Sequence, residues 1–155
     1  MPTEPTLEYH YTFDGWTNNC GDELTGNCTI TANFSRRKRS YTVQIASNNT
    51  SYGAVTPWSV TAEYGAPIVL DNVDRKIRIY GTTIMAMPLD DTEEYDYELE
   101  KWSFSNCGDE GNYSVRPNCT ITAIFTRTTN QYTVTIGSNN TEYGTVDESS
   151  FTVDY

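Results

Sequence analysis

The sequence contains one histidine, His10, and only 10 Lys and Arg residues among 155. No Ser or Cys lies in a nucleophile motif, and no histidine recurs beside the repeated cysteines, so we expect no catalytic residues and no enzyme. A pair of carboxylates at a glycosidase spacing stays open, although no feature of the sequence selects one pair.

Long apolar runs are also missing, since no stretch approaches the ~18–20 residues of a membrane-spanning helix. Neither a basic start nor an apolar core follows Met1, so a secretion signal would have to lie outside this sequence. Asp and Glu number 21, which gives a net charge of −11. An acidic chain repels phosphates and anionic lipids, so we expect neither nucleic-acid binding nor membrane insertion. The one basic run, residues 36–39, is interpreted as a solvated linker.

What the sequence does contain is an internal repeat. Residues 28–64 align with residues 119–155, and more than half of the positions are identical, including "YTVQIASNNTSYGAV" against "YTVTIGSNNTEYGTV". Residues 1–16 align with residues 87–102. The second copy is slightly longer around its cysteines, as expected of loops between fixed strands. The sequence therefore predicts tandem modules of about 90 residues each.

The alignment divides the chain into the second half of one repeat (1–40), one complete repeat (41–131) and the first hairpin of a third (132–155). Met1 aligns with Met87 and Tyr155 with Tyr64, both inside the complete repeat. We expect a window from a longer head-to-tail array, in which Met1 is not an initiator. The alternative is a polymerising subunit, in which the last hairpin completes the first half-repeat of the next molecule by strand donation.

Within one repeat, apolar and polar residues alternate, which is typical of half-buried β-strands. The alternation covers residues 41–45, 60–64, 76–79, 84–87, 95–99 and 119–125. The first two segments are predicted to form a hairpin around "SNNTSYG", in which Gly53 is free to adopt positive φ. The next two form a second hairpin with Ile77 and Ile79 pointing inward. Only "GAPIVLDNVDR" (65–75) allows a short helical turn, so the fold class is mainly β.

The alternation slips by one residue before Trp16 and before Trp102, which is the mark of a β-bulge. A bulge at this point would turn each tryptophan inward. We therefore predict that both tryptophans belong to the core and bind no ligand.

The four cysteines form two equivalent pairs, Cys20 with Cys28 and Cys107 with Cys119. Each pair brackets the loop between two strands predicted to be neighbours, so a disulfide would stabilise the module by roughly 2.5–3 kcal/mol. Zinc sites favour shorter spacings and four ligands, so we expect no metal and no cofactor. The acidic run at 89–100 suits calcium in composition, but we interpret it as a solvated strand face. Disulfides imply an oxidising compartment.

The order of these signals, "YTVQI", a turn with "YG", "SVTAEYG", "FDGW" and "CTITANF", resembles the internalin-type B-repeat, also called the Listeria–Bacteroides repeat. The resemblance covers essentially the whole chain. It implies small β-grasp-like modules, strung in tandem on a bacterial surface protein between the cell envelope and a binding domain. This sequence differs from the family pattern in its extra "IRIYGTTIMAMP" hairpin and in its cysteine pairs.

Two functions follow as hypotheses. The first is a structural one: an extracellular stalk, adhesin or filament segment whose partners are neighbouring copies of itself. The second is a surface module that binds glycans or a host or cell-surface protein through Trp58, whose equivalent is Ser149 and which the fold therefore does not need. Sequons begin at several asparagines. If the protein is glycosylated, the best sites are Asn48 and Asn139, which lie in the same exposed turn of each copy, and Asn33 and Asn112 are further candidates.

Overall fold

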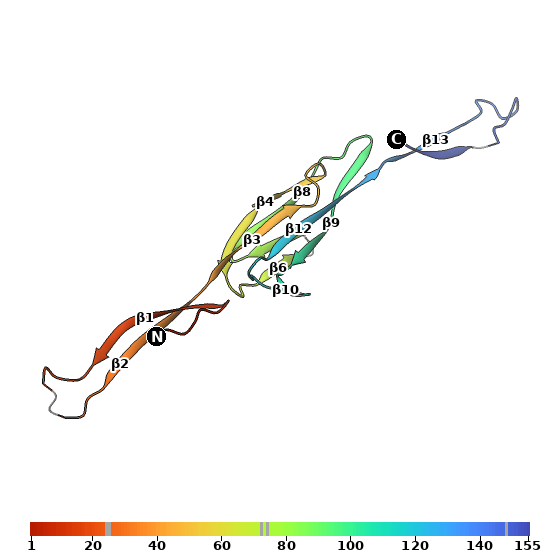
Figure 1. Cartoon of the computed structure of the whole chain (residues 1–155). Coiled ribbons are helices and arrows are strands. Elements are labelled where there is room, and N and C mark those ends of the chain that lie inside the picture. Colours follow the sequence, from red (N-terminus) through yellow and green to blue (C-terminus); the bar gives the residue numbers. More distant parts are fainter. Residues whose placement is uncertain (24–25, 72, 74, 148) are drawn as a thin grey trace.

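A computed structural model describes residues 1–23, 26–71, 73, 75–147 and 149–155. Every regular element within these ranges is a β-strand, so the predicted mainly β fold class is confirmed. The molecule is elongated, with one two-stranded hairpin at each end of a larger central unit (Figure 1). The described residues contain no helix that is long and apolar enough to cross a membrane.

The first sheet of the central unit consists of β3 (Ser40–Ser47), β5 (Ser59–Glu63), β9 (Tyr95–Ser105) and β12 (Thr120–Thr129). Its order is β5-β3-β12-β9. The two central strands, β3 and β12, run parallel, and each outer strand is antiparallel to its neighbour. Strands that are far apart in the sequence therefore meet at the middle of the sheet.

The second sheet consists of β4 (Gly53–Thr56), β6 (Ile68–Asp71), β7 (Lys76–Ile79) and β8 (Thr82–Pro88), in the order β4-β8-β7-β6. The predicted hairpin of β7 and β8 is confirmed, and Ile77 and Ile79 are fully buried. The helical turn allowed at 65–75 is wrong, because residues 68–71 form β6. The first predicted hairpin is correct in pairing β3 with β5, but the intervening chain crosses to the other sheet as β4.

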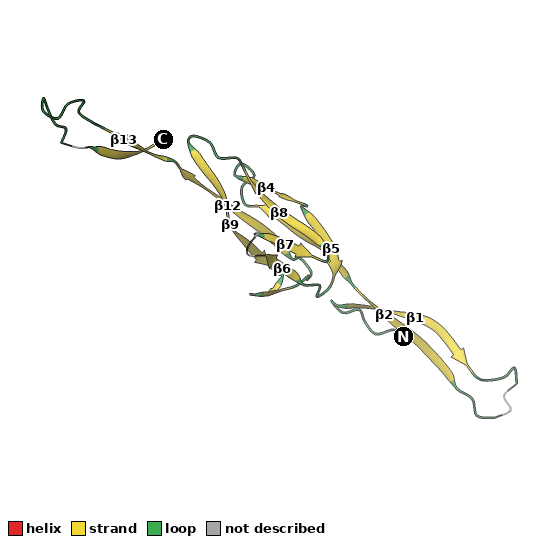
Figure 2. Cartoon of the chain, turned by 180° about the vertical axis from the view of Figure 1, so that it is seen from behind, coloured by secondary structure: helices red, strands yellow, loops and turns green. Residues whose placement is uncertain are grey.

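The core lies between the two sheets, which pack face to face (Figure 2). Inward side chains alternate with exposed ones along β3, β5, β7 and β12, as expected of strands with one buried face. The buried residues are Val43, Ile45, Val60, Ala62, Ile68, Ile77, Ile79, Ile84, Leu99, Trp102, Cys107, Val115, Cys119, Ile121, Ala123 and Phe125.

The N-terminal hairpin is formed by β1 (Tyr9–Asn18) and β2 (Ile30–Lys38), and the C-terminal hairpin by β13 (Gln131–Thr135) and β14 (Ser150–Asp154). By sequence alignment, β1 and β2 are equivalent to β9 and β12, and β13 and β14 to β3 and β5. The predicted bulges are confirmed: the β1·β2 register shifts between Phe13 and Gly15, and the β9·β12 register shifts at Leu99. Each hairpin therefore has the same strand pairing as its counterpart in the central unit.

The prediction that both tryptophans belong to the core is right for Trp102 and wrong for Trp16. Trp102 exposes 8% of its surface, and its Nε1 donates a hydrogen bond of 2.8 Å to the carbonyl of Arg75. Trp16 exposes 66%. The reason is that Arg75 belongs to the turn between β6 and β7, and no second sheet covers the N-terminal hairpin within the described residues.

Candidate functional site at the two junctions

The N-terminal hairpin joins the central unit at one residue, Arg39, which we call the N junction. The Arg39 N–H donates to the carbonyl of Glu8 at 2.9 Å, and the Arg39 carbonyl accepts from the N–H of Tyr64 at 2.8 Å. Arg39 therefore extends the ladder of the hairpin on one side and the ladder of β3 and β5 on the other. The chain passes from one unit to the next without an unpaired linker.

The C-terminal hairpin joins the central unit at the equivalent residue, Asn130, the C junction. The Asn130 N–H donates to the carbonyl of Glu94 at 2.9 Å, and its carbonyl accepts from the N–H of Tyr155 at 3.0 Å. These partners align with Glu8 and Tyr64 in the sequence. The two junctions therefore use the same backbone hydrogen bonds.

A tyrosine hydroxyl reinforces each junction from the first strand of the following unit. The Tyr41 hydroxyl donates to the carbonyl of Leu7 at 2.7 Å. The equivalent Tyr132 hydroxyl donates to the carbonyl of Glu93 at 2.6 Å. Because each bond ties a side chain of one unit to the backbone of the unit before it, the hydroxyls oppose bending between units.

The junction residues themselves add a second tie, although their side chains differ. The Arg39 guanidinium donates to the carbonyl of Thr6 at 3.2 Å. The Asn130 amide donates to the carbonyl of Thr92 at 2.9 Å, and Thr92 is the residue equivalent to Thr6. A long cation and a short amide therefore reach the same backbone position.

The threonines hold the receiving segments in shape. The Thr6 hydroxyl accepts from the N–H of Tyr9 at 2.9 Å, and the Thr92 hydroxyl accepts from the N–H of Tyr95 at 2.9 Å. A side-chain hydroxyl that caps a turn fixes the carbonyls beside it. The acceptors at residues 6–8 and 92–94 are therefore presented in one geometry at both ends of the central unit.

An arginine stacked on a tyrosine ring lies beside each junction. Arg127 on β12 lies over the ring of Tyr95, with its guanidinium carbon 4.0 Å from the centroid, and 5.2 Å from that of Tyr52. On the N-terminal hairpin, Arg36 lies 4.2 Å from the centroid of Tyr9. The stacking brings an arginine close to aromatic faces, which stabilises the pair modestly at exposed sites.

This cluster changes two pKa values. The hydrogen bond to Glu94 raises the pKa of the Tyr95 hydroxyl above its ordinary value, against the opposing charge of Arg127. For Arg127, desolvation alone would lower the pKa, but attraction to Tyr52 and Tyr95 outweighs it and the pKa is raised. Tyr95 therefore remains protonated and Arg127 charged at neutral pH.

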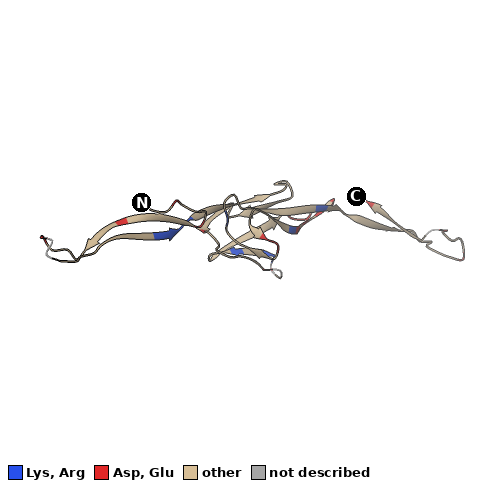
Figure 3. Ribbon diagram, turned by 60° about the horizontal axis from the view of Figure 1, so that its bottom comes forward, with Lys and Arg blue, Asp and Glu red and all other residues tan. Residues whose placement is uncertain are grey.

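The basic run at 36–39, interpreted from sequence as a solvated linker, has a defined structure at the end of β2. Figure 3 shows these basic residues where the N-terminal hairpin meets the central unit. Besides the stacking of Arg36 and the junction bond of Arg39, Lys38 lies 4.0 Å from the Glu8 carboxylate. The run is therefore structured, although an exposed pair of this length contributes little stability.

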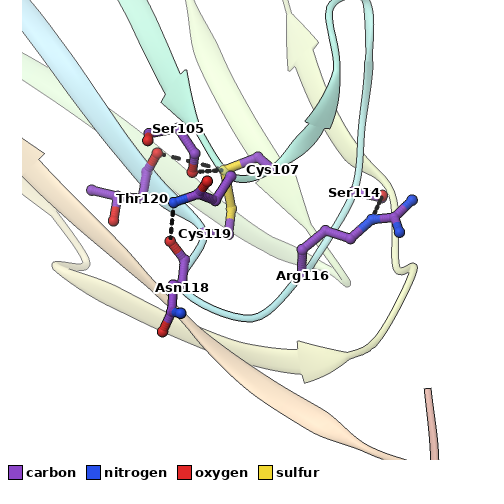
Figure 4. Close-up of a disulfide and its surroundings, with 8 residues drawn as sticks. Ser105, Cys107, Ser114, Arg116, Asn118, Cys119 and Thr120 are labelled. Carbon is purple, nitrogen blue, oxygen red and sulfur yellow. Dashed lines mark hydrogen bonds between the residues drawn. A yellow bond between two sulfur atoms is a disulfide. The ribbon is translucent and has the colours of Figure 1, made fainter. Parts of the chain in front are cut away.

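The predicted disulfides, Cys20–Cys28 and Cys107–Cys119, are confirmed. Cys107–Cys119 is buried in the core of the central unit, at the end of β9 and the start of β12 (Figure 4). The Cys107 sulfur lies 3.1 Å from the carbonyl oxygen of Ser105, which is a close contact because a disulfide sulfur carries no proton to donate. A short hairpin of β10 (Gly108–Asp109) and β11 (Asn112–Tyr113) fills the loop that this bridge closes.

The four glycosylation candidates differ in how their amides are engaged. The Asn48 amide donates to the carbonyl of Phe125 at 3.1 Å, and its oxygen accepts from the Phe125 N–H at 2.8 Å. The Asn33 amide donates to the Thr17 hydroxyl at 3.2 Å. Asn112 is exposed on β11, and the exposed Asn139 forms no hydrogen bond within the described residues. The Asn48 side chain therefore ties the turn after β3 to β12, and the use of any of the four asparagines as a glycan site stays a prediction.

Trp58, the predicted binding residue, lies before β5 and exposes 72% of its surface. Its backbone is fixed, because the Trp58 carbonyl accepts from the N–H of Ile45 at 2.9 Å. Within the described residues, no three His, Cys, Asp or Glu side chains lie close enough together to hold a metal ion.

No protein-family model, curated protein or solved structure matches this chain. Sequence reasoning missed the junctions, whose acceptors are backbone carbonyls and whose side chains differ at Arg39 and Asn130. The available signal was the recurrence of Tyr41 at Tyr132 and of Thr6 at Thr92.

Proposed function

We propose that this chain belongs to a structural spacer, an extracellular stalk, adhesin or filament segment in which β modules of about 90 residues follow one another in tandem. The proposal includes the resemblance to the internalin-type B-repeat and excludes catalysis. The observation that carries it is the junction: two positions one module apart are held by the same backbone bonds and by a tyrosine hydroxyl to the same kind of acceptor. A spacer needs a fixed angle between modules, and junctions without an unpaired linker supply one.

Two further observations support the modular part of the proposal. The order β5-β3-β12-β9 gives a mixed sheet with a parallel central pair, which suits a β-grasp-like module in which a second sheet covers the core. The disulfides suit an oxidising, extracellular location, because thiols are kept reduced in the cytosol.

Small-angle X-ray scattering of the dilute, monomeric chain tests the spacer. We expect the profile of a rigid rod for the wild type. The double variant Asn130→Ala, Tyr132→Phe removes the side-chain ties of the C junction and should shift the profile toward a flexible chain. Gln131→Ala is the matched control, because the one side-chain bond of Gln131 among the described residues goes to Asp154 inside the hairpin, at 2.7 Å. A wild type as flexible as the double variant would refute the proposal.

The second candidate is a glycan- or protein-binding module, and the exposed Trp58 favours it. A large aromatic side chain on a fixed backbone is suited to stack on a sugar or to anchor a partner. A glycan-array or pull-down signal that disappears in Trp58→Ala would support this function. Equal signals from the wild type and the variant would refute it.

A further inference from the structure

Each terminal hairpin leaves unpaired the strand edge that is paired in its counterpart in the central unit. Within the described residues, β2 pairs only with β1, and β13 pairs only with β14. In the central unit their equivalents, β12 and β3, pair with each other in parallel, with Ile121 opposite Ile45 and Ala123 opposite Ser47. An unpaired edge is a template for another strand. The central unit therefore contains the pairing that would join these two edges.

On one face of β2 the side chains are apolar where their counterparts on β12 are buried. Ile30 exposes 63% of its surface and Phe34 exposes 49%. Their equivalents on β12, Ile121 and Phe125, expose 0% and 1%. The N-terminal hairpin thus presents to solvent the same residues that the central unit buries.

The C-terminal hairpin has the same property. Val134 and Ile136 are exposed, whereas their equivalents Val43 and Ile45 are buried. The hairpin is also correctly folded to receive a partner. Its Ile136 N–H donates to the carbonyl of Ser149 at 2.9 Å, as Ile45 donates to Trp58. The edge of β13 that faces away from β14 is therefore equivalent to the edge of β3 that pairs with β12.

The turn after β13 has the same hydrogen bonds as the turn after β3, although it lacks a partner strand like β12 within the described residues. The N–H of Asn140 donates to the Ser138 hydroxyl at 3.3 Å, and the N–H of Glu142 donates to the Asn140 side chain at 2.9 Å. The same two bonds form the turn after β3, at 3.2 and 2.9 Å, between the aligned residues. The turn is therefore determined locally and needs no partner strand.

In the central unit this turn meets β12 through one glycine and one asparagine. A Cβ on Gly53 would lie 2.6 Å from the ring of Phe125, so glycine is required there by close approach. Gly53 is not among the glycines with positive φ, so the predicted reason for this glycine is wrong. Apart from its chain neighbours, no atom of the described residues lies within 4 Å of the Cβ position of the equivalent Gly144. Gly144 and Asn139 therefore match Gly53 and Asn48, but among the described residues no strand packs against them as β12 packs against Gly53 and Asn48.

We propose that residues 135–138 of one copy of this chain, which continue the path of β13 beyond its last residue, pair in parallel with β2 of a second copy, in the register that β3 and β12 use. Ile136 then lies opposite Ile30, and Ser138 opposite Ala32. The Asn139 amide bonds to the backbone of Phe34, as Asn48 bonds to Phe125. The four strands form a sheet in the order β14-β13-β2-β1. The apolar face that β6, β7 and β8 cover in the central unit stays open in this sheet.

Charge and aromatic stacking favour the same partner. Residues 131–155 contain Asp and Glu but no Lys or Arg, and β2 ends in the basic run. Opposite charges on two surfaces select and orient the correct partner. Tyr143, which exposes 88% of its surface, is equivalent to Tyr52 beside Arg127. On docking it reaches Arg36, which already stacks on Tyr9, and completes the tyrosine–arginine cluster.

The two docking hairpins lie at opposite ends of the molecule (Figure 1). A contact between two different surfaces of the same chain is heterologous, and it extends into an open filament where it does not close into a ring. The proposal rests on the proposed function, because both assume that each terminal hairpin is equivalent to part of the central unit. It adds that separate chains assemble through these hairpins.

Sedimentation velocity of the full chain over a concentration series tests the proposal with two glycine variants. Gly144→Ala places a methyl group where the Phe34 ring must dock, and should weaken association by roughly tenfold or more. Gly137→Ala is the matched control, because the equivalent residue in the central unit is Ala46. Among the described residues, and apart from chain neighbours, neither glycine has an atom within 4 Å of its Cβ position. Association that Gly144→Ala leaves unchanged, or a wild type that stays monomeric throughout, would overturn the proposal.

Disulfide trapping tests the register. An oxidised mixture of Ala32→Cys chains and Ser138→Cys chains should give a cross-linked dimer, and Ala32→Cys with Thr133→Cys should not. Equal trapping by both mixtures, or by neither, contradicts the register. A wild type that stays monomeric but scatters as a rigid rod would refute the docking proposal and leave the spacer proposal standing. A wild type that scatters as a flexible chain would refute the spacer proposal.

Discussion

Replacing Trp102 by alanine should destabilise the central unit far more than the same change at Trp16 in the N-terminal hairpin. The two residues are equivalent in sequence and follow equivalent bulges, yet they expose 8% and 66% of their surface. Trp102 therefore buries roughly half a side chain more, about 75–125 Å² of the about 150–250 Å² of a large aromatic. At about 25 cal/mol per Å², this is about 2–3 kcal/mol.

Two further effects act only at Trp102. The cavity left between the sheets adds to the transfer cost, which brings the expected loss for Trp102→Ala to about 3–5 kcal/mol. The variant also removes the donor to the carbonyl of Arg75, but Arg75 is exposed and water can replace it. For Trp16→Ala we expect a change below about 0.5 kcal/mol, as for other surface positions.

Urea denaturation followed by far-UV circular dichroism measures the difference, because this signal comes mainly from the backbone amides and its midpoint can be compared between variants that lack different tryptophans. The midpoint should fall strongly for Trp102→Ala and stay close to the wild-type value for Trp16→Ala. Equal midpoints for the two variants would refute the reasoning, since they would mean that the second sheet does not cover Trp102.

Three other changes give expected outcomes in the same denaturation assay. Replacing Cys107 and Cys119 by serine should cost about 3 kcal/mol, because the bridge closes a loop of about 13 residues; an unchanged midpoint would contradict the structural role of the bridge. Asn48→Ala should cost about 1–3 kcal/mol through two lost bonds to β12, whereas Asn139→Ala should have no effect on the monomer. Gly53→Ala should cost about 1–3 kcal/mol through overpacking against β12, and a stabilised variant would show that the close approach does not exist.

Local signals predict much of this fold. The alternation of apolar and polar residues predicts that β3 and β12 are strands, and the phase slip before Trp102 predicts the bulge. Both predictions succeed because they depend only on the two-residue period of a strand. The crossing of β4 to the second sheet depends on tertiary packing at Gly53, which periodicity does not report. Residues 68–71 form a short apolar run, and such a run does not distinguish a strand from a helical turn.

The candidate site was less accessible to sequence reasoning than the cysteine pairing. Disulfides follow from recurring cysteines, whereas each junction depends on backbone carbonyls, as at Leu7, that leave no mark on residue identity. The opposite outcomes at Trp16 and Trp102 make a related point. A residue type predicts burial only where the covering layer is present, and β6 and β7 cover one hairpin and not the other.

The central claim, that the junctions hold successive units at a fixed angle, is tested most directly by residual dipolar couplings of the backbone amides in a weakly aligned, dilute sample. If the C junction is rigid, one alignment tensor of one magnitude fits the amides of β12, β13 and β14 together. If β13 and β14 need a separate tensor of smaller magnitude, the C-terminal hairpin moves independently of the central unit, and the account of this chain as a rigid spacer is wrong.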